Sequence, residues 1–75
     1  MRGDWPDAGV TFDVTRGSFD ISRGVMERAA ATGDDWEIRR AYATALPLEA
    51  SAYRRERLRD GGMRVYWRTI RVVAA

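Results

Sequence analysis

The sequence has 75 residues and contains neither cysteine nor histidine. This length suits one domain, near the lower limit at which an apolar core stabilises a chain unaided. The two absences exclude disulfides, Cys-type zinc sites and imidazole catalysis. We therefore expect a single domain over residues 1–75 with an N-terminal segment at 1–8, no cofactor, no metal site, no small-molecule substrate and no enzymatic activity. Since no run of about 18 apolar residues or signal peptide is present, we expect a cytoplasmic protein that avoids membranes.

The charge is distributed unevenly along the chain. The net charge is +2, and all thirteen cationic side chains are arginine. Residues 1–50 carry six Arg against nine acids, whereas residues 51–75 carry seven Arg against two acids, so the two parts have net charges of −3 and +5. Such a split steers an acidic partner toward the C-terminal third, or lets the two parts attract each other within the fold.

A tandem heptad gives the clearest local pattern: Thr11-Phe-Asp-Val-Thr-Arg-Gly17 is followed by Ser18-Phe-Asp-Ile-Ser-Arg-Gly24. Apolar and polar residues alternate in both copies, and Gly17 lies where a tight turn needs a positive φ. The pattern predicts a β-hairpin that turns at residues 15–18. In that hairpin one face, directed at the helices, carries Phe12, Val14, Phe19 and Ile21.

Helical patterns follow from Ser22 onward. Ser22 is a natural N-cap for a helix over residues 23–31 that Gly33 closes, and Asp34 starts a second helix that runs to Ala45, with Glu37 in capping-box spacing. Pro47 fits the first turn of a third helix, over residues 48–59, which the glycines at 61 and 62 end. Alternatively, residues 35–59 form one long helix that is kinked at the proline.

Residues 63–73 are rich in β-branched and aromatic residues, which is typical of a strand. The apolar positions switch from odd to even numbers beyond Trp67, which predicts a bulge near Arg68 and Thr69 or burial on both faces. Trp67 is expected to be buried beside Val65. The predicted fold is α+β: an N-terminal β-hairpin, two to three short helices, and a C-terminal strand that joins the hairpin in one antiparallel sheet packed on the helices.

The arginine cluster near residue 57 is the best candidate for a binding surface. The guanidinium group of arginine can bind a phosphate through two hydrogen bonds, and an exposed tyrosine ring can stack on a base. The pattern therefore favours nucleic acid or an acidic protein surface as the partner. The expected partner-binding residues are Arg54, Arg55, Arg57, Arg59, Arg64, Tyr66 and Arg68. On the predicted third helix, Arg55 and Arg59 are four residues apart and form a stripe on the helix surface that is free to contact a partner. In the alternative interpretation, Asp13 and Asp20 neutralise Arg64 and Arg68 across the sheet.

Two short segments invite comparison with known families. The stretch Leu58-Arg-Asp-Gly-Gly-Met63 resembles the end of the recognition helix in a winged helix-turn-helix, but the pattern departs from that family upstream, at Ser51 and at Leu46-Pro47. The tripeptide Arg2-Gly3-Asp4 looks like the integrin-binding loop of disintegrins, which are disulfide-rich secreted proteins. Neither resemblance assigns a family.

The expected function is that of a small, non-catalytic regulatory or adaptor protein, of a kind that phages and mobile elements encode. It binds a macromolecule through its Arg-rich surface, with nucleic acid slightly favoured. The alternative is an inhibitor or assembly adaptor that docks on a host or structural protein without contacting nucleic acid. This expectation rests on the small size of the chain and on its lack of the usual catalytic residues.

Overall fold

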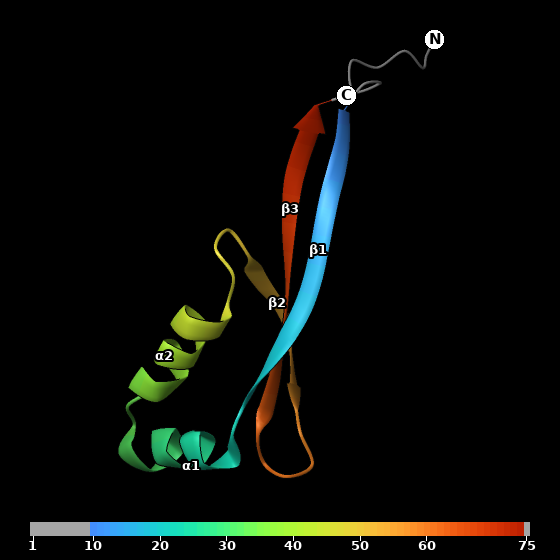
Figure 1. Ribbon diagram of the computed structural model, residues 1–75. Helices are drawn as coiled ribbons and strands as arrows, with labels where there is room; N and C mark the ends of the chain where they lie inside the picture. Colours follow the sequence, from blue (N-terminus) through green and yellow to red (C-terminus); the bar gives the residue numbers. More distant parts are fainter. Residues whose placement is uncertain (1–9, 75) are drawn as a thin grey trace.

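The computed structural model describes residues 10–74 and has the element order β1 (Val10–Ile21), α1 (Arg23–Thr32), α2 (Trp36–Ala45), β2 (Ser51–Arg57) and β3 (Met63–Ala74) (Figure 1). The three strands form one antiparallel sheet in the order β1-β3-β2. This confirms the predicted α+β class with a C-terminal strand in the same sheet as the N-terminal one. The RGD tripeptide and the expected N-terminal segment at 1–8 lie outside the described residues.

The predicted N-terminal hairpin is wrong, because β1 is one continuous strand of twelve residues. Its register with β3 runs without interruption from Val10 opposite Ala74 to Ile21 opposite Met63. Gly17 lies inside this strand opposite Trp67 and does not have a positive φ. A glycine is needed here for space, since the indole of Trp67 lies against the backbone at Gly17.

The seven-residue repeat has a structural consequence in a continuous strand. Side chains alternate between the two faces of a sheet, so an odd repeat places equivalent residues on opposite faces. Phe19 therefore lies on the face that α2 covers, in edge-to-face contact with Tyr42 at 5.4 Å between ring centroids. Phe12 and Val14 lie on the other face and are 62% and 43% exposed. The predicted sharing of one face by all four apolar residues is wrong for this reason.

The helices are capped largely as predicted. Ser22 Oγ accepts a hydrogen bond from the amide of Val25, and Gly33 closes α1 in the left-handed region with φ 73°. The amide of Trp36 donates to Asp34 Oδ1 at the start of α2. Glu37 does not complete a capping box, because both its carboxylate oxygens accept from Arg28 at 2.7 Å. This ion pair joins α1 to α2.

The predicted third helix is wrong, as is the single kinked helix, because residues 51–57 form strand β2. The chain turns where the amide of Ala50 donates to the carbonyl of Pro47, and Glu49 has a positive φ of 65°, which a helix excludes. Pairing with β3 then overrides the helix propensity of a segment in which five of seven residues are Arg, Ala or Glu. The winged helix-turn-helix resemblance fails here, since residues 51–57 form no recognition helix.

The hairpin of this fold connects β2 to β3. Gly61 has a positive φ of 95°, its amide donates to the carbonyl of Leu58, and Asp60 Oδ1 accepts from the amide of Gly62. The bulge predicted near Arg68 is absent from the β1–β3 register, and the irregularity lies instead at Tyr53 in β2.

The apolar core is small and lies where the helices cover the sheet. Among residues 11–73, Ile21 and Val65 are the buried hydrophobic residues, and Trp67 beside them is half-buried rather than buried. The molecule is elongated, with extents of 58 × 22 × 17 Å, because β1 and β3 continue as a two-stranded ribbon beyond β2 (Figure 1). Ile70 and Val72 on this ribbon are exposed, so the predicted burial on both faces of the last strand is also wrong.

Within residues 10–74, neither helix has the length and apolarity that crossing a bilayer requires.

Candidate functional site

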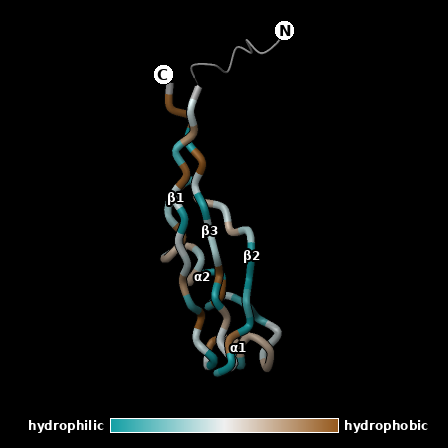
Figure 2. The backbone as a smooth tube through the Cα atoms, turned by 90° about the vertical axis from the view of Figure 1, so that its right-hand side faces the viewer, coloured by the Kyte–Doolittle hydropathy of each residue, from teal (hydrophilic) through white to brown (hydrophobic). Residues whose placement is uncertain are grey.

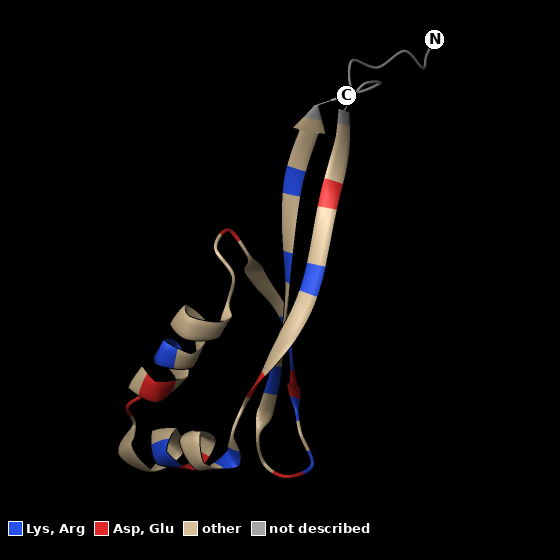
Figure 3. Cartoon of the chain, viewed as in Figure 1, with Lys and Arg blue, Asp and Glu red and all other residues tan. Residues whose placement is uncertain are grey.

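The face of the sheet opposite the helices carries most of the basic and aromatic side chains of the predicted site. We call it the open face. The register places on it alternate residues of all three strands, namely Arg16, Ser18 and Asp20 of β1, Arg54 and Glu56 of β2, and Arg64, Tyr66 and Arg68 of β3. Charged residues occur along all three strands of the sheet (Figure 3). The open face is therefore polar and mixed in charge near the β2–β3 turn and basic further along.

Four side chains form a row on the open face, which we call the Arg–Tyr stack, with an arginine at each end and two tyrosines between them: Arg54, Tyr66, Tyr53 and Arg68. The guanidinium of Arg54 lies 5.0 Å from the ring centroid of Tyr66, and that of Arg68 lies 5.4 Å from the centroid of Tyr53. The two rings are 6.5 Å apart and tilted by 44°. Cation–π attraction of this kind orients guanidinium groups that would otherwise be free. Tyr53, 48% exposed, presents part of its ring to solvent.

The bulge in β2 makes this stack possible. Ala52 lies opposite Trp67 and Arg54 lies opposite Tyr66, so Tyr53 is the extra residue between two consecutive positions of β3. A bulged residue is released from strict alternation. Its ring reaches the open face, where it fills the space between Tyr66 and Arg68.

Charge at the two ends of the open face differs. Near the turn, Arg64 donates two hydrogen bonds to Asp20, at 2.7 and 3.0 Å, and Tyr66 donates its hydroxyl to Glu56 at 2.6 Å. The hydrogen bond from Arg64 lowers the pKa of Asp20, and the same contact raises the pKa of Arg64. Further along, Arg16 lies opposite Arg68, and neither pairs with a carboxylate of residues 10–74. Cationic charge is thus available at that end.

The structure separates the seven predicted partner-binding residues. It brings Arg54, Arg64, Tyr66 and Arg68 together on the open face. Arg55 and Arg57 lie on the helix-covered face: Arg55 donates to the hydroxyl of Tyr42 at 2.9 Å, and Arg57 lines a concavity with residues of α1. Arg59 lies in the β2–β3 turn. The predicted free stripe of Arg55 and Arg59 is wrong, because Arg55 lies on the helix-covered face of β2 and Arg59 lies beyond the end of that strand.

Sequence reasoning missed two members of the open face. The hairpin prediction places Arg16 in a turn, and this residue would be found if the heptad repeat were interpreted as a single strand. Tyr53 reaches this face only through a bulge, which no local pattern in β2 indicates. The expected neutralisation by aspartates holds for Asp20 with Arg64, whereas Asp13 pairs with Arg71 on the helix-side face.

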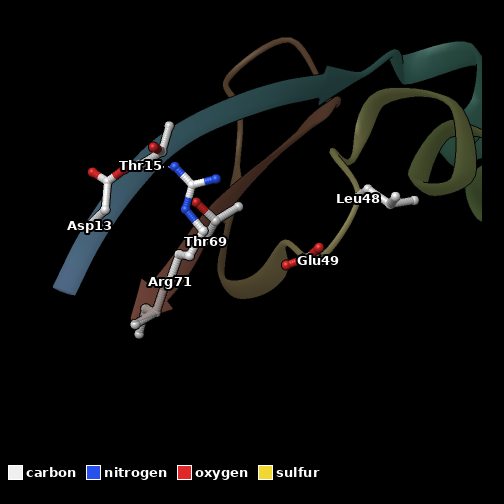
Figure 4. Close-up of a pocket in the computed structure, with 7 residues that line it drawn as sticks. Asp13, Thr15, Leu48, Glu49, Thr69 and Arg71 are labelled. Carbon is white, nitrogen blue, oxygen red and sulfur yellow. Dashed lines mark hydrogen bonds and ion pairs between the residues drawn. The ribbon is translucent and has the colours of Figure 1, made fainter. Parts of the chain in front are cut away.

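Hollows lie between α2 and the sheet, beside α1, and where the α2–β2 loop borders strand β3 near Arg68 and Ile70. An open groove of about 580 Å³ between α2 and the sheet is lined by apolar residues such as Ile38 and Leu46, with Asp35, Arg39 and Arg55 at its margin. A smaller hollow lies where the α2–β2 loop, with Leu48 and Glu49, faces Asp13 and Arg71 of the ribbon (Figure 4). Leu48 is 90% exposed, so this hollow is open to solvent. No metal-binding group of three or more acids is found within residues 10–74.

Comparison with known proteins gives one short match. No family model matches the chain, and no solved structure matches it. A segment of 33 residues is 52% identical to part of L-cysteine:1D-myo-inositol 2-amino-2-deoxy-alpha-D-glucopyranoside ligase from Thermobifida fusca (strain YX). The segment covers 44% of this chain and 8% of that protein. A match of this extent shows similarity of one segment and no family.

Proposed function

We propose that this chain is a small, non-catalytic binding protein of the regulatory or adaptor kind, which acts in the cytoplasm and takes single-stranded nucleic acid on the open face of its sheet. The observation that carries the proposal is the Arg–Tyr stack, with the guanidiniums of Arg54 and Arg68 over two tyrosine rings. Single strands are recognised by basic grooves or surfaces in which bases stack on aromatic rings and on guanidinium planes.

The charge pattern supports a phosphate backbone along one end of the open face. Arg16 and Arg68 are neighbours on adjacent strands, and both are exposed. Like charges directly opposite each other on a sheet are mutually destabilising. An anion bound between them would remove that repulsion, so a phosphate of the bound strand gains from both guanidiniums at once.

Paired variants on the two faces of β2 test this proposal. Arg54→Gln removes a cation from the open face, and Arg55→Gln removes one from the helix-covered face, only one residue away in sequence. Binding of a fluorescent oligothymidine or oligouridine is measured by anisotropy over a series of salt concentrations. We expect Arg54→Gln and Arg68→Gln each to weaken binding and to reduce the slope of log affinity against log salt by about one. Arg55→Gln should leave the slope unchanged.

Replacing Tyr53 tests the stacking part separately from the charge. Tyr53→Ala should weaken binding by about 1–3 kcal/mol per base stacked while leaving the salt slope unaltered. Absence of any oligonucleotide binding at low salt, or equal losses for Arg54→Gln and Arg55→Gln, would contradict the proposal.

A second candidate function has its own supporting observation. Four apolar side chains are exposed where β1 and β3 continue beyond β2 as a two-stranded ribbon, and an apolar patch of this kind is typical of a protein interface: Phe12, Val14, Ile70 and Val72. An inhibitor or assembly adaptor that docks on a host or structural protein would use this patch. Its binding would depend little on salt, which distinguishes it from phosphate recognition.

A further inference from the structure

The distal ribbon has two chemically different faces. Beyond β2, residues 10–15 of β1 pair only with residues 69–74 of β3. On the helix-side face of this ribbon, Thr15 lies opposite Thr69, Asp13 forms an ion pair with Arg71, and Thr11 lies opposite Val73. On the open face, the cross-strand pairs are entirely apolar: Phe12 with Val72, and Val14 with Ile70. The helix-side face is thus mainly polar, with Val73 as its exposed apolar residue, whereas the open face of the ribbon is apolar.

These four apolar residues, which we call the ribbon patch, are far from buried. Phe12, Val14, Ile70 and Val72 are 62%, 43%, 53% and 63% exposed, and hydrophobic colouring marks the ends of β1 and β3 (Figure 2). Together they expose about 400 Å² of apolar surface, which falls within the range of the largest patches on ordinary monomers. The helices lie on the other side of the sheet, and the α2–β2 loop approaches the patch at Ile70, which lines two hollows together with Glu49 and remains half exposed.

From this patch we infer that the chain forms a two-fold symmetric dimer through the open face of its distal ribbon. This inference does not depend on nucleic-acid binding. Within residues 11–73 the chain keeps only two hydrophobic residues buried, so its folded state gains unusually little from its own core. A second copy of the chain presents the same uncharged surface. In a two-fold symmetric dimer the same patch contributes both sides of the interface, so the patch needs only to be complementary to itself.

Repulsion between arginine side chains determines the relative orientation of the two ribbons in the dimer. If they packed parallel, Arg16 of each copy would lie over Arg68 of the other. If they pack antiparallel, with the two-fold axis at the level of Asp13 and Arg71, the Arg16–Arg68 pairs lie about three residues to either side of the axis. At about 3.3 Å per residue the pairs are then roughly 20 Å apart, beyond the screening length in physiological salt. The antiparallel arrangement is therefore the one we assign.

Side-chain size fits the same arrangement. Antiparallel packing brings Phe12 of each copy over Val14 of the other, and Val72 over Ile70. Each large ring thus meets a smaller side chain, as interdigitating sheet faces require. The buried area, about 800 Å² for the two patches together, is below that of a standard stable interface. The dimer should accordingly be weak and dependent on concentration. The centre of the Arg–Tyr stack lies beyond the overlap and stays accessible.

The experiment measures self-association of the whole chain in the absence of oligonucleotide, by sedimentation velocity over a concentration series. We expect the wild type to shift from monomer to dimer as concentration rises. Val72→Thr, which replaces one methyl by a hydroxyl within the patch, should raise the dissociation constant at least tenfold. Val73→Thr is the matched control, because Val73 is the adjacent residue on the opposite face and should leave the dissociation constant unchanged.

Orientation is tested separately, and the chain suits this because it has no native cysteine. An equimolar mixture of Val72→Cys and Ile70→Cys chains should give mainly mixed disulfides on oxidation. A wild type that stays monomeric at every concentration would overturn the inference, as would equal effects of Val72→Thr and Val73→Thr. A monomer that instead binds neutral lipid vesicles through the patch would overturn it in favour of a membrane surface. Because no nucleic acid is present, none of these results bears on the proposed function.

Discussion

Replacing Gly17 by alanine gives a direct test of the continuous β1 strand. Gly17 lies opposite Trp67, and a Cβ at this position would lie 2.7 Å from Cε2 and 3.0 Å from Cη2 of that indole, and closer still to Cζ2. Unstrained carbon contacts need about 3.5–4.0 Å. The indole would have to swing away from the strand, leaving its place beside Ala52.

The expected loss of stability can be worked out from two opposing effects. Overpacking of this kind costs about 1–3 kcal/mol. The lower entropy of the unfolded chain that carries the Gly17→Ala substitution returns about 0.4–1 kcal/mol. The net destabilisation is therefore about 1–2 kcal/mol, which in a domain of this size lowers the Tm by about 4–8 °C for each kcal/mol.

The assay is urea and thermal unfolding followed by tryptophan fluorescence. Gly24→Ala is the control, because a Cβ at Gly24 meets nothing closer than 3.4 Å and lies in the first turn of α1, where alanine favours the helix. The two alanine variants should move stability in opposite directions. If Gly17→Ala proves as stable as the wild type with unchanged fluorescence emission, the indole does not lie over the strand and the hairpin turn regains support.

Three further predictions concern the rest of the fold. Val65→Ala should cost about 2 kcal/mol in urea unfolding, because it empties part of the core, whereas Val72→Ala on the exposed ribbon should stay within about 0.5 kcal/mol at a protein concentration at which the chain is monomeric. Ser22→Ala should cost about 1 kcal/mol by removing the N-cap of α1, and circular dichroism should show the loss of helix before that of strand. Hydrogen bonds from Arg64 and Arg28 lower the pKa of the Asp20 and Glu37 carboxyl groups, respectively. These two ion pairs therefore stabilise the fold at neutral pH, and their contribution is lost as the pH falls below about 4. Arg64→Gln should flatten the acidic part of the plot of unfolding free energy against pH, and an unchanged plot would refute the Asp20 contact.

Local signals predicted the parts of the fold that depend on neighbouring residues. The cap at Ser22 and the left-handed closure at Gly33 bound α1 within one residue of the expected limits, and the β-branched residues of β3 indicated a strand. The two ends of α1 are stabilised by groups a few residues apart, and the composition of β3 favours an extended backbone. The sequence is therefore sufficient to place them.

Non-local pairing explains what local reasoning got wrong. Gly17 in an alternating segment is as consistent with a turn as with a residue that makes room for Trp67, and Trp67 is fifty positions away in the chain. The segment over residues 51–57 has the composition of a helix and becomes a strand only because β3 offers its edge. The prediction of the candidate site was wrong in part for the same reason. The cluster of arginines was visible, but its division between two faces depends on β2 being a strand.

The position of a bound oligonucleotide tests the proposed function most directly. The three tyrosines of the chain provide the contrast, since Tyr53 and Tyr66 lie on the open face while Tyr42 packs against Phe19 on the helix-covered face. A single strand containing 5-bromouracil is bound to the protein, cross-linked by ultraviolet light and mapped by mass spectrometry. We predict cross-links at Tyr53 and Tyr66 and none at Tyr42. Cross-links confined to Tyr42 or to the helices, or no complex at low salt, would contradict binding on the open face.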